Sequence, residues 1–153
     1  MTKTLNNGII YMISTVLMGS EREPGLMSKK DLLSVMAVRQ ALKFNCAAIS
    51  EKYKLISEMI GDINKELIEE YREDEKVDIV DETYIVKKEF EKEFLDEQQE
   101  KLNELSVQPI DIDLATYPRD KFNAYAEMND GKLTEAELDI LEMFVEEETD
   151  KIE

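Results

Sequence analysis

Apolar residues recur at helical spacing through the middle of the chain and predict one long helix. From Ser28 to about Tyr71 they alternate at intervals of three and four residues, the heptad pattern of a helix that packs along its whole length. At a rise of ~1.5 Å per residue this helix would be about 65 Å long. The heptad positions, of which only Arg39 is polar, are Leu32, Val35, Arg39, Leu42, Cys46, Ile49, Tyr53, Ile56, Ile60, Ile63 and Leu67.

The apolar stripe is wider than a coiled-coil seam, because further apolar residues lie beside it. They are Leu33, Met36, Phe44, Leu55 and Met59. A stripe of this width favours coverage by several elements over a bare two-stranded coiled coil. Ser28 and Asp31 resemble a capping box, with the shorter acid in place of glutamate, and predict that the helix begins near Ser28.

A first, shorter helix is predicted over about residues 7–18. Asn6 or Asn7 can cap its start, and Gly19 with Pro24 ends it in a loop. Its apolar residues share one face at helical spacing: Ile9, Ile13, Val16 and Leu17.

Two helices are predicted after the long one. The first covers about residues 87–105, and Pro118 opens the second, which carries Phe122 and Tyr125. The apolar residues of the first are Phe90, Phe94, Leu95, Leu102 and Leu105, while its other face is dense in glutamate.

The last predicted helix, over residues 134–148, has the clearest start signal in the chain. Thr134 and Glu137 have the spacing of a capping box, and Leu133 with Leu138 has that of a hydrophobic staple. Its predicted buried face consists of Leu138, Leu141, Phe144 and Val145.

Two short segments predict a β-hairpin. Val77–Val80 and Tyr84–Val86 flank a polar turn. Val107–Ile112 is extended, and Pro109 confines it to a sheet edge, where it could join the hairpin as a third strand. The predicted fold is therefore mainly α, with one long heptad-patterned helix covered by shorter helices, and with a small β-hairpin or three-stranded sheet.

The chain has a net charge of −17, and its negative charge is concentrated in its second part. Residues 1–60 hold eight basic and five acidic residues, whereas residues 61–153 hold 11 basic and 31 acidic ones, a net charge of −20. Such a field repels nucleic acid and anionic membranes and attracts basic protein surfaces, although solubility alone is an alternative role. We predict a single helical domain over residues 1–148, followed by an acidic tail over residues 149–153.

Residues that carry common enzyme chemistry are scarce. The chain has no histidine, and Cys46 is its only cysteine, which excludes an intramolecular disulfide, a Cys/His zinc site and a Cys–His nucleophile pair within one chain. Its five glycines are scattered singly and form no phosphate-binding loop. We therefore expect that the protein is not an enzyme and uses no cofactor.

Residues 129–137 resemble the second half of an EF-hand calcium loop. With Gly131 at the sixth position, Glu137 falls at the twelfth, where calcium takes a bidentate carboxylate. The first and third positions are then Ala126 and Met128, whose side chains cannot bind calcium. Because a capping box explains the same residues, no metal site is expected.

The N-terminal apolar run, Ile9–Met18, follows Lys3 and resembles a signal peptide. Cleavage after Gly19 or Ser20 would place a large apolar residue where a small one is needed, and the run is too short to span a bilayer. We therefore expect a buried helix of a cytosolic protein. Basic residues are too few and too scattered for a nucleic-acid-binding patch.

Several segments also occur in a recognisable order along nearly the whole chain. They are residues 6–11, the long helix, and the segments 79–86, 89–94, 107–112 and 133–137. Together they resemble a family of small acidic proteins of unknown function, encoded by phages and prophages of Gram-positive bacteria. Residues 45–48 depart from the family pattern, which has more arginine and lysine there. The resemblance implies a phage gene product in the cytoplasm of its bacterial host, and it carries over no functional residues.

We predict a phage accessory protein that binds a host or phage protein with a basic surface. The prediction rests on the negative charge of residues 61–153, on the scarcity of catalytic residue types and on the resemblance to phage proteins. One concrete form is a counter-defence inhibitor with an acidic surface that mimics nucleic acid. The alternative is a morphogenesis factor, either an assembly chaperone or a small virion component. No direct binding of nucleic acid or membrane is expected, and homo-oligomerisation is left open. The acids expected to contact the partner are Glu89, Glu93, Glu97, Glu100, Glu142 and Glu146.

Overall fold

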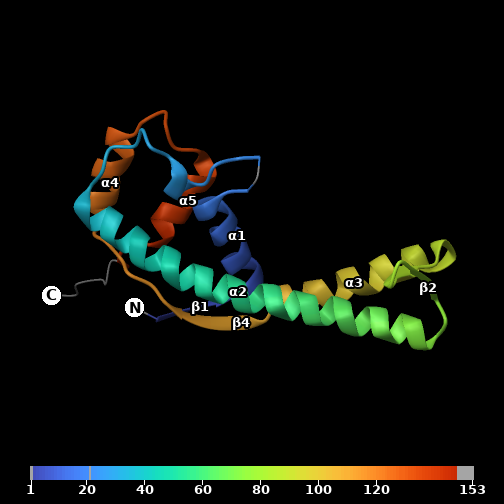
Figure 1. Cartoon of the computed structure of the whole chain (residues 1–153). Coiled ribbons are helices and arrows are strands. Elements are labelled where there is room, and N and C mark those ends of the chain that lie inside the picture. The colour runs from blue at the N-terminus through green and yellow to red at the C-terminus, as the bar shows by residue number, and fades with distance from the viewer. Residues whose placement is uncertain (1, 21, 148–153) are drawn as a thin grey trace.

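The long helix, α2, spans Met36–Glu73 and connects two parts of the molecule (Figure 1). The computed structural model describes residues 2–20 and 22–147. The first half of α2 lies in a rounded head, together with helices from both ends of the chain, and its second half projects beside helix α3, Glu91–Ser106 (Figure 1). We call residues 57–106 the arm and the other described residues the head.

Helix α2 begins at Met36, so the prediction that it starts near Ser28 was wrong. Residues 29–35 form no helical turn, the backbone at Val35 is extended, and no capping box of Ser28 and Asp31 forms. Tertiary hydrogen bonds hold this segment. The side chain of Asn129 accepts a bond from the backbone N–H of Leu33 at 2.7 Å and donates one to its carbonyl at 2.9 Å. Backbone groups bonded in this way are not available for helical turns.

The prediction that several elements cover the apolar stripe of α2 is confirmed. In the head the stripe is covered by helices α1 (Asn7–Met18) and α4 (Arg119–Met128) and by strand β4 (Pro109–Asp113). In the arm it is covered by α3. Leu32 and Val35, two of the heptad positions, precede the helix and are half-buried, and Arg39 is exposed. The buried face of α2 consists of Val38, Ala41, Leu42, Asn45, Ile49, Ile56, Leu67 and Tyr71.

One of these buried residues is polar and serves as a clamp. Asn45 is completely buried, and its amide donates a hydrogen bond to the carbonyl of Ala115 at 2.9 Å. The Ala115 N–H donates in return to the Asn45 side-chain oxygen at 2.6 Å. This pair of bonds ties the connection between β4 and α4 to the first half of α2. The buried amide of Asn45 is therefore fully hydrogen-bonded.

The head contains three further helices and a short 3-10 helix. They are α1 (Asn7–Met18), η1 (Leu26–Ser28), α4 (Arg119–Met128) and α5 (Glu135–Met143). The predicted first helix is confirmed, and Asn6 caps it by accepting a hydrogen bond from the backbone of Ile9 at 2.8 Å. The predicted capping box of Thr134 and Glu137 is also confirmed.

Helix α5 ends at Met143, five residues short of the predicted end at 148. Phe144 and Val145 are buried as predicted, but they lie beyond the helix. The chain there runs beside Tyr117, whose backbone N–H donates to the Phe144 carbonyl and whose carbonyl accepts from Glu146. This bridge replaces the next helical turn. The predicted acidic tail over residues 149–153 lies outside the described residues.

Two separate two-stranded antiparallel sheets form. Strand β2 (Val77–Val80) pairs with β3 (Thr83–Val86), which confirms the predicted hairpin. Strand β4 (Pro109–Asp113) was predicted to be able to join this hairpin, but it pairs with β1 (Thr2–Asn6) instead. Helix α3 is the reason, because it carries the chain from the hairpin at the tip of the arm back to the head before β4 begins (Figure 1).

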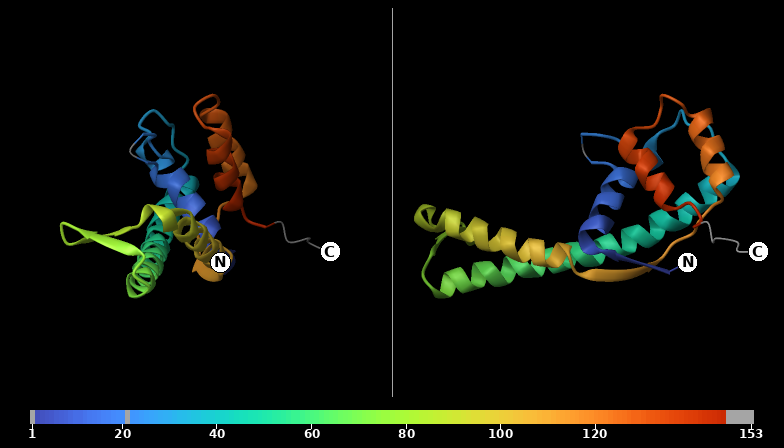
Figure 2. Two further views of the ribbon diagram at one scale, coloured as in Figure 1. Left: turned by 90° about the vertical axis from the view of Figure 1, so that its right-hand side faces the viewer. Right: turned by 180° about the vertical axis from the view of Figure 1, so that it is seen from behind.

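The arm is a pair of antiparallel helices with the hairpin at its tip. Its second helix begins with the 3-10 turn η2 (Lys88–Phe90) and continues as α3 (Glu91–Ser106), close to the predicted bounds. The hairpin projects sideways from the helix pair, which is clearest when the arm is viewed from its end (Figure 2). Elements of the arm are therefore surrounded by solvent on several sides.

Candidate functional site

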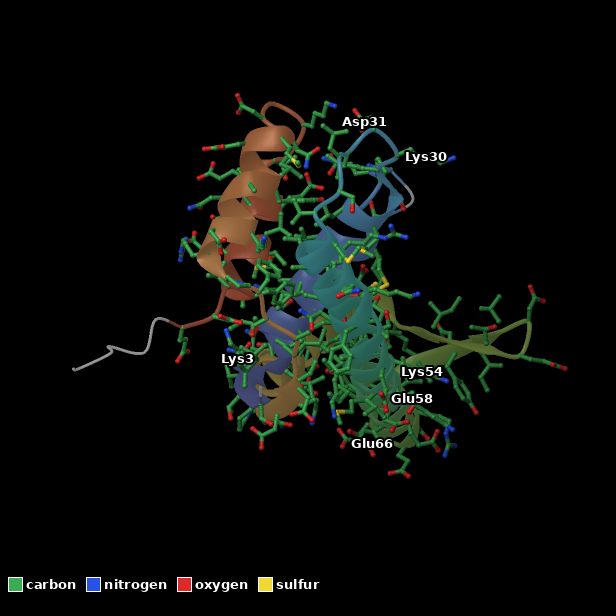
Figure 3. All side chains as sticks on the ribbon, turned by 90° about the vertical axis from the view of Figure 1, so that its left-hand side faces the viewer. Lys3, Lys30, Asp31, Lys54, Glu58 and Glu66 are labelled. Atoms are coloured by element: carbon green, nitrogen blue, oxygen red, sulfur yellow. The ribbon has the colours of Figure 1, made fainter. Side chains whose placement is uncertain are left out.

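The outer face of α2 in the arm carries a row of acidic side chains. Its members, all exposed, are Glu58, Asp62, Glu66, Glu69 and Glu73. Intervals of three and four residues keep them on one side of the helix, turned away from the buried Leu67 and Tyr71. Glu58 and Glu66 extend outward from α2 in Figure 3. We call this row the α2 ridge.

Helix α3 carries a second row of acids at helical spacing. It consists of Glu93, Asp96, Glu97, Glu100 and Glu104, of which Glu97 is half-buried and the others are exposed. The inner face of α3 carries Phe94 and Leu105. We call this second row the α3 ridge.

Few cations offset the two ridges. Residues 57–106 include 18 acidic and seven basic residues, a net charge of −11. In the described chain, the ion pairs made by ridge residues join Arg72 to Glu69 and Lys76 to Glu93, the latter at 3.1 Å. The arm therefore presents carboxylates to solvent along both of its helices.

The six acids predicted to contact a partner fall into two groups. Glu93, Glu97 and Glu100 belong to the α3 ridge, and Glu89 lies just before it in η2. The other two, Glu142 in α5 and Glu146 after its end, belong to the head, and Glu142 pairs with Arg119 at 3.0 Å. The structure thus brings four of the six acids together on the arm and places two elsewhere.

None of the five acids of the α2 ridge was predicted to contact a partner, although the signal was present. The five acids have the same three-and-four spacing as the apolar seam, displaced to another face of the helix. The exposure of the hairpin to solvent was also not predicted. The strongly exposed side chains there are Ile79 at 69%, Ile85 at 50% and Val80 at 49% exposure.

The base of the hairpin is braced against the helices by aromatic and cationic contacts. The ring of Tyr71 packs edge-on against Phe94, with 5.2 Å between ring centroids. Lys76 lies 5.2 Å from the ring centroids of both Tyr71 and Phe90 and pairs with Glu93. Burial, reinforced by the negative charge of Glu97 and Glu93, raises the pKa of Tyr71 to about 12. These contacts fix the hairpin relative to the ridges.

The segment that resembles an EF-hand loop, residues 129–137, has a structural role through Glu137. The carboxylate of Glu137 is buried, accepts a bond from the Thr134 backbone N–H at 2.9 Å and forms an ion pair with Lys29. Lys29 also donates to the carbonyl of Lys132 at 2.9 Å, so Glu137 joins the segment before α2 to the start of α5. Among residues 2–20 and 22–147, no three His, Cys, Asp or Glu side chains are grouped to hold a metal ion.

Comparison with known proteins found no matching family model, no matching curated protein and no matching solved structure. In the part of the chain that the structure describes, no helix is both long and apolar enough to cross a membrane. A function for this chain is therefore inferred from its own surface.

Proposed function

We propose that the chain is a non-enzymatic binding protein that uses its acidic arm to engage the basic surface of another protein. The observation that carries this proposal is the pair of acidic ridges on a projecting element, where 50 residues have a net charge of −11. Acids needed only for solubility need no such concentration on one projection. Concentrated charge of one sign steers a partner of opposite charge and speeds its association.

The ridges support the more specific form of the proposal, a counter-defence inhibitor that mimics nucleic acid. The α2 ridge places five carboxylates over the 16 residues from Glu58 to Glu73, or ~22 Å at a rise of 1.5 Å per residue. That is one charge about every 5–6 Å, compared with one phosphate about every 3.4 Å along a DNA strand. A basic groove that binds a phosphate backbone would meet a similar, sparser row of anions. The resemblance to phage proteins supports a host or phage protein as the partner.

The exposed apolar side chains support the alternative, a morphogenesis factor such as an assembly chaperone or a small virion component. Besides the hairpin, Phe44 at 53% and Met36 at 73% exposure lie on the surface of α2 in the head. A partner that binds through these residues would be held by apolar contacts, which salt does not screen.

Association kinetics separate the two forms. A protein recovered with the chain from Gram-positive host cells and identified by mass spectrometry would be purified as the partner. Its association rate would be measured with the wild type and with a triple reversal of Asp96, Glu100 and Glu104 to lysine. These three acids are exposed and form no ion pair in the described chain, whereas Glu93 and Glu97 contact the Lys76–Tyr71 brace.

A matched control reverses Glu127, Asp130 and Asp139, three exposed acids of the head. We expect the arm reversal to slow association at least about tenfold at low salt, and the head reversal to slow it less. At about 1 M salt, where the Debye length is ~3 Å, the difference should disappear. Equal effects of the two reversals, or a rate that salt does not change, would refute binding through the arm and favour the morphogenetic alternative.

A further inference from the structure

The hairpin at the tip of the arm is a two-stranded sheet, and in the described chain each of its strands has an unpaired outer edge. Neither β2 nor β3 pairs with any other described strand. A two-stranded sheet is marginally stable in water and needs a third strand or a packed face for support. Helix α2 supports the hairpin at its base, where Val77 and Val86 are half-buried. It also supports the hairpin at Tyr84, whose ring centroid lies 6.0 Å from the guanidinium of Arg72.

Both faces of the hairpin expose apolar side chains beyond that base. The register pairs Ile79 with Tyr84 on one face, and Val80 with Thr83 beside Ile85 on the other. The β1–β4 sheet differs, because it packs on the head and its Ile112 is 3% exposed. The hairpin thus has the composition of a covered sheet, although Ile79, Val80 and Ile85 remain largely exposed.

Strand β3 also lacks the features that protect a free sheet edge. Its sequence, Thr83-Tyr84-Ile85-Val86, contains no charge and no proline, and each residue favours the strand conformation. Free edges are usually blunted by charged side chains, proline or bulges. In β2 the charged Asp78 provides such protection. The outer edge of β3 is therefore the open one.

Charge around this edge indicates what can bind there. Asp81 and Glu82 form the turn, with φ angles of 50° and 65°, and the acidic run 73–75 ends α2 just before the hairpin. These carboxylates repel the same edge of a second copy of the chain and attract lysine and arginine. We infer that β3 accepts an extended segment of a partner protein, with alternating apolar and basic residues, as a third strand of the sheet.

This inference rests on the proposed function and assigns its docking site. The acidic ridges attract a basic partner, and strand β3 of the hairpin then binds it by strand addition. The probe is a labelled decapeptide of alternating valine and lysine, and its binding is measured by fluorescence anisotropy. A decapeptide of alternating serine and lysine has the same charge without the apolar face. A third version carries an N-methyl group on every residue of the valine–lysine peptide, which removes the N–H donors of both edges.

Two protein variants report on the docking site. Ile85→Ser removes an exposed apolar side chain of β3, and Val107→Ser is the matched control, because Val107 is 70% exposed and lies after α3, away from the hairpin. We expect the valine–lysine peptide to bind the wild type at least about tenfold more tightly than the serine–lysine peptide. Ile85→Ser and N-methylation should each remove that advantage, and Val107→Ser should not.

Other results would distinguish failure of the docking site on β3 from failure of the proposed function of the acidic arm. Equal, salt-sensitive binding of both unmethylated peptides would overturn the docking site and leave the acidic arm as the attracting surface. No binding of either peptide at low salt would refute the proposed function itself. Tight binding of the N-methylated peptide would overturn strand addition without any change to the protein. A dimer of the wild type in sedimentation velocity, lost in Ile85→Ser, would show that a second copy occupies the edge.

Discussion

The head and the arm share one helix but differ in what holds them together. Of the 21 buried apolar residues in the described chain, 18 form the core of the head, and only Leu67, Tyr71 and Leu105 lie in the arm. The arm holds a third of the residues and carries −11 of the net charge of −17. Several elements thus pack on the first half of α2, although Met36 and Phe44 stay exposed there, whereas α3 covers the second half along one side.

The difference shows how α2 can carry a row of acidic residues on its outer face and still remain helical. Helices in proteins depend mainly on the packing of their apolar face, and the head supplies that packing for the first half of α2. The second half needs only α3 along one side, which leaves its outer face free for the ridge. A region with so few buried contacts should open locally without unfolding the head.

Substitution of one buried leucine in each region is expected to give the largest difference, which is in the free energy of unfolding. Leu141 in the head and Leu67 in the arm are both completely buried. We expect Leu141→Ala to lower the free energy of global unfolding by about 2–5 kcal/mol, because it leaves a cavity in a core that cannot collapse. Leu67→Ala should lower global stability less, because the thin arm can close around the gap. Urea denaturation measures both values.

Hydrogen exchange sharpens the same comparison. In Leu67→Ala, amides in the arm portion of α2 and in α3 should exchange faster, while those of α1 keep their protection. Equal losses of global stability in the two variants, with protection lost evenly across the chain, would mean that head and arm unfold as one unit.

The buried tyrosines give a smaller effect that depends on pH. Burial raises the pKa of Tyr71 in the arm to about 12, and burial raises that of Tyr117 in the head still further. Because both values lie above that of an unfolded tyrosine, 10.0, the neutral forms stabilise the fold fully below pH 10. This stabilisation is lost as the pH rises from about 10 through the folded value.

Absorbance at alkaline pH should therefore show Tyr71 ionising before Tyr117, whose hydroxyl donates to the carbonyl of Leu141. Replacing Tyr71 with phenylalanine should remove the component near pH 12, and the Tyr117 component should remain until the head unfolds. Ionisation of Tyr117 before Tyr71 would contradict the difference in burial between the two regions.

Calcium is expected to have the smallest effect, namely none. Glu137, the residue at the bidentate position of the EF-hand-like segment, is buried and paired with Lys29. Millimolar calcium or a chelator should leave the melting temperature unchanged once ionic strength is matched with sodium salt. A rise of several degrees with calcium alone would require a bound ion that stabilises the folded state.

Elements whose signals lie within a few neighbouring residues could be predicted from the sequence. Asn6 accepts a bond from Ile9 within three residues, so the start of α1 was predictable. The same holds for the capping box of Thr134 and Glu137, and for the hairpin, where a polar turn joins two apolar segments. The seam of α2 was readable too, because its period is set by the geometry of the helix itself.

The tertiary structure alone decided features that depend on residues distant in the sequence. Asn129 and Glu137 lie about a hundred positions after the segment that they hold, and they move the start of α2 to Met36. The pairing of β1 with β4 and the separation of Glu142 from the arm acids follow from the path of α3. Hydropathy records only which side chains avoid water. It does not record which distant backbone a polar side chain will bond, and that bonding fixed the start of the long helix.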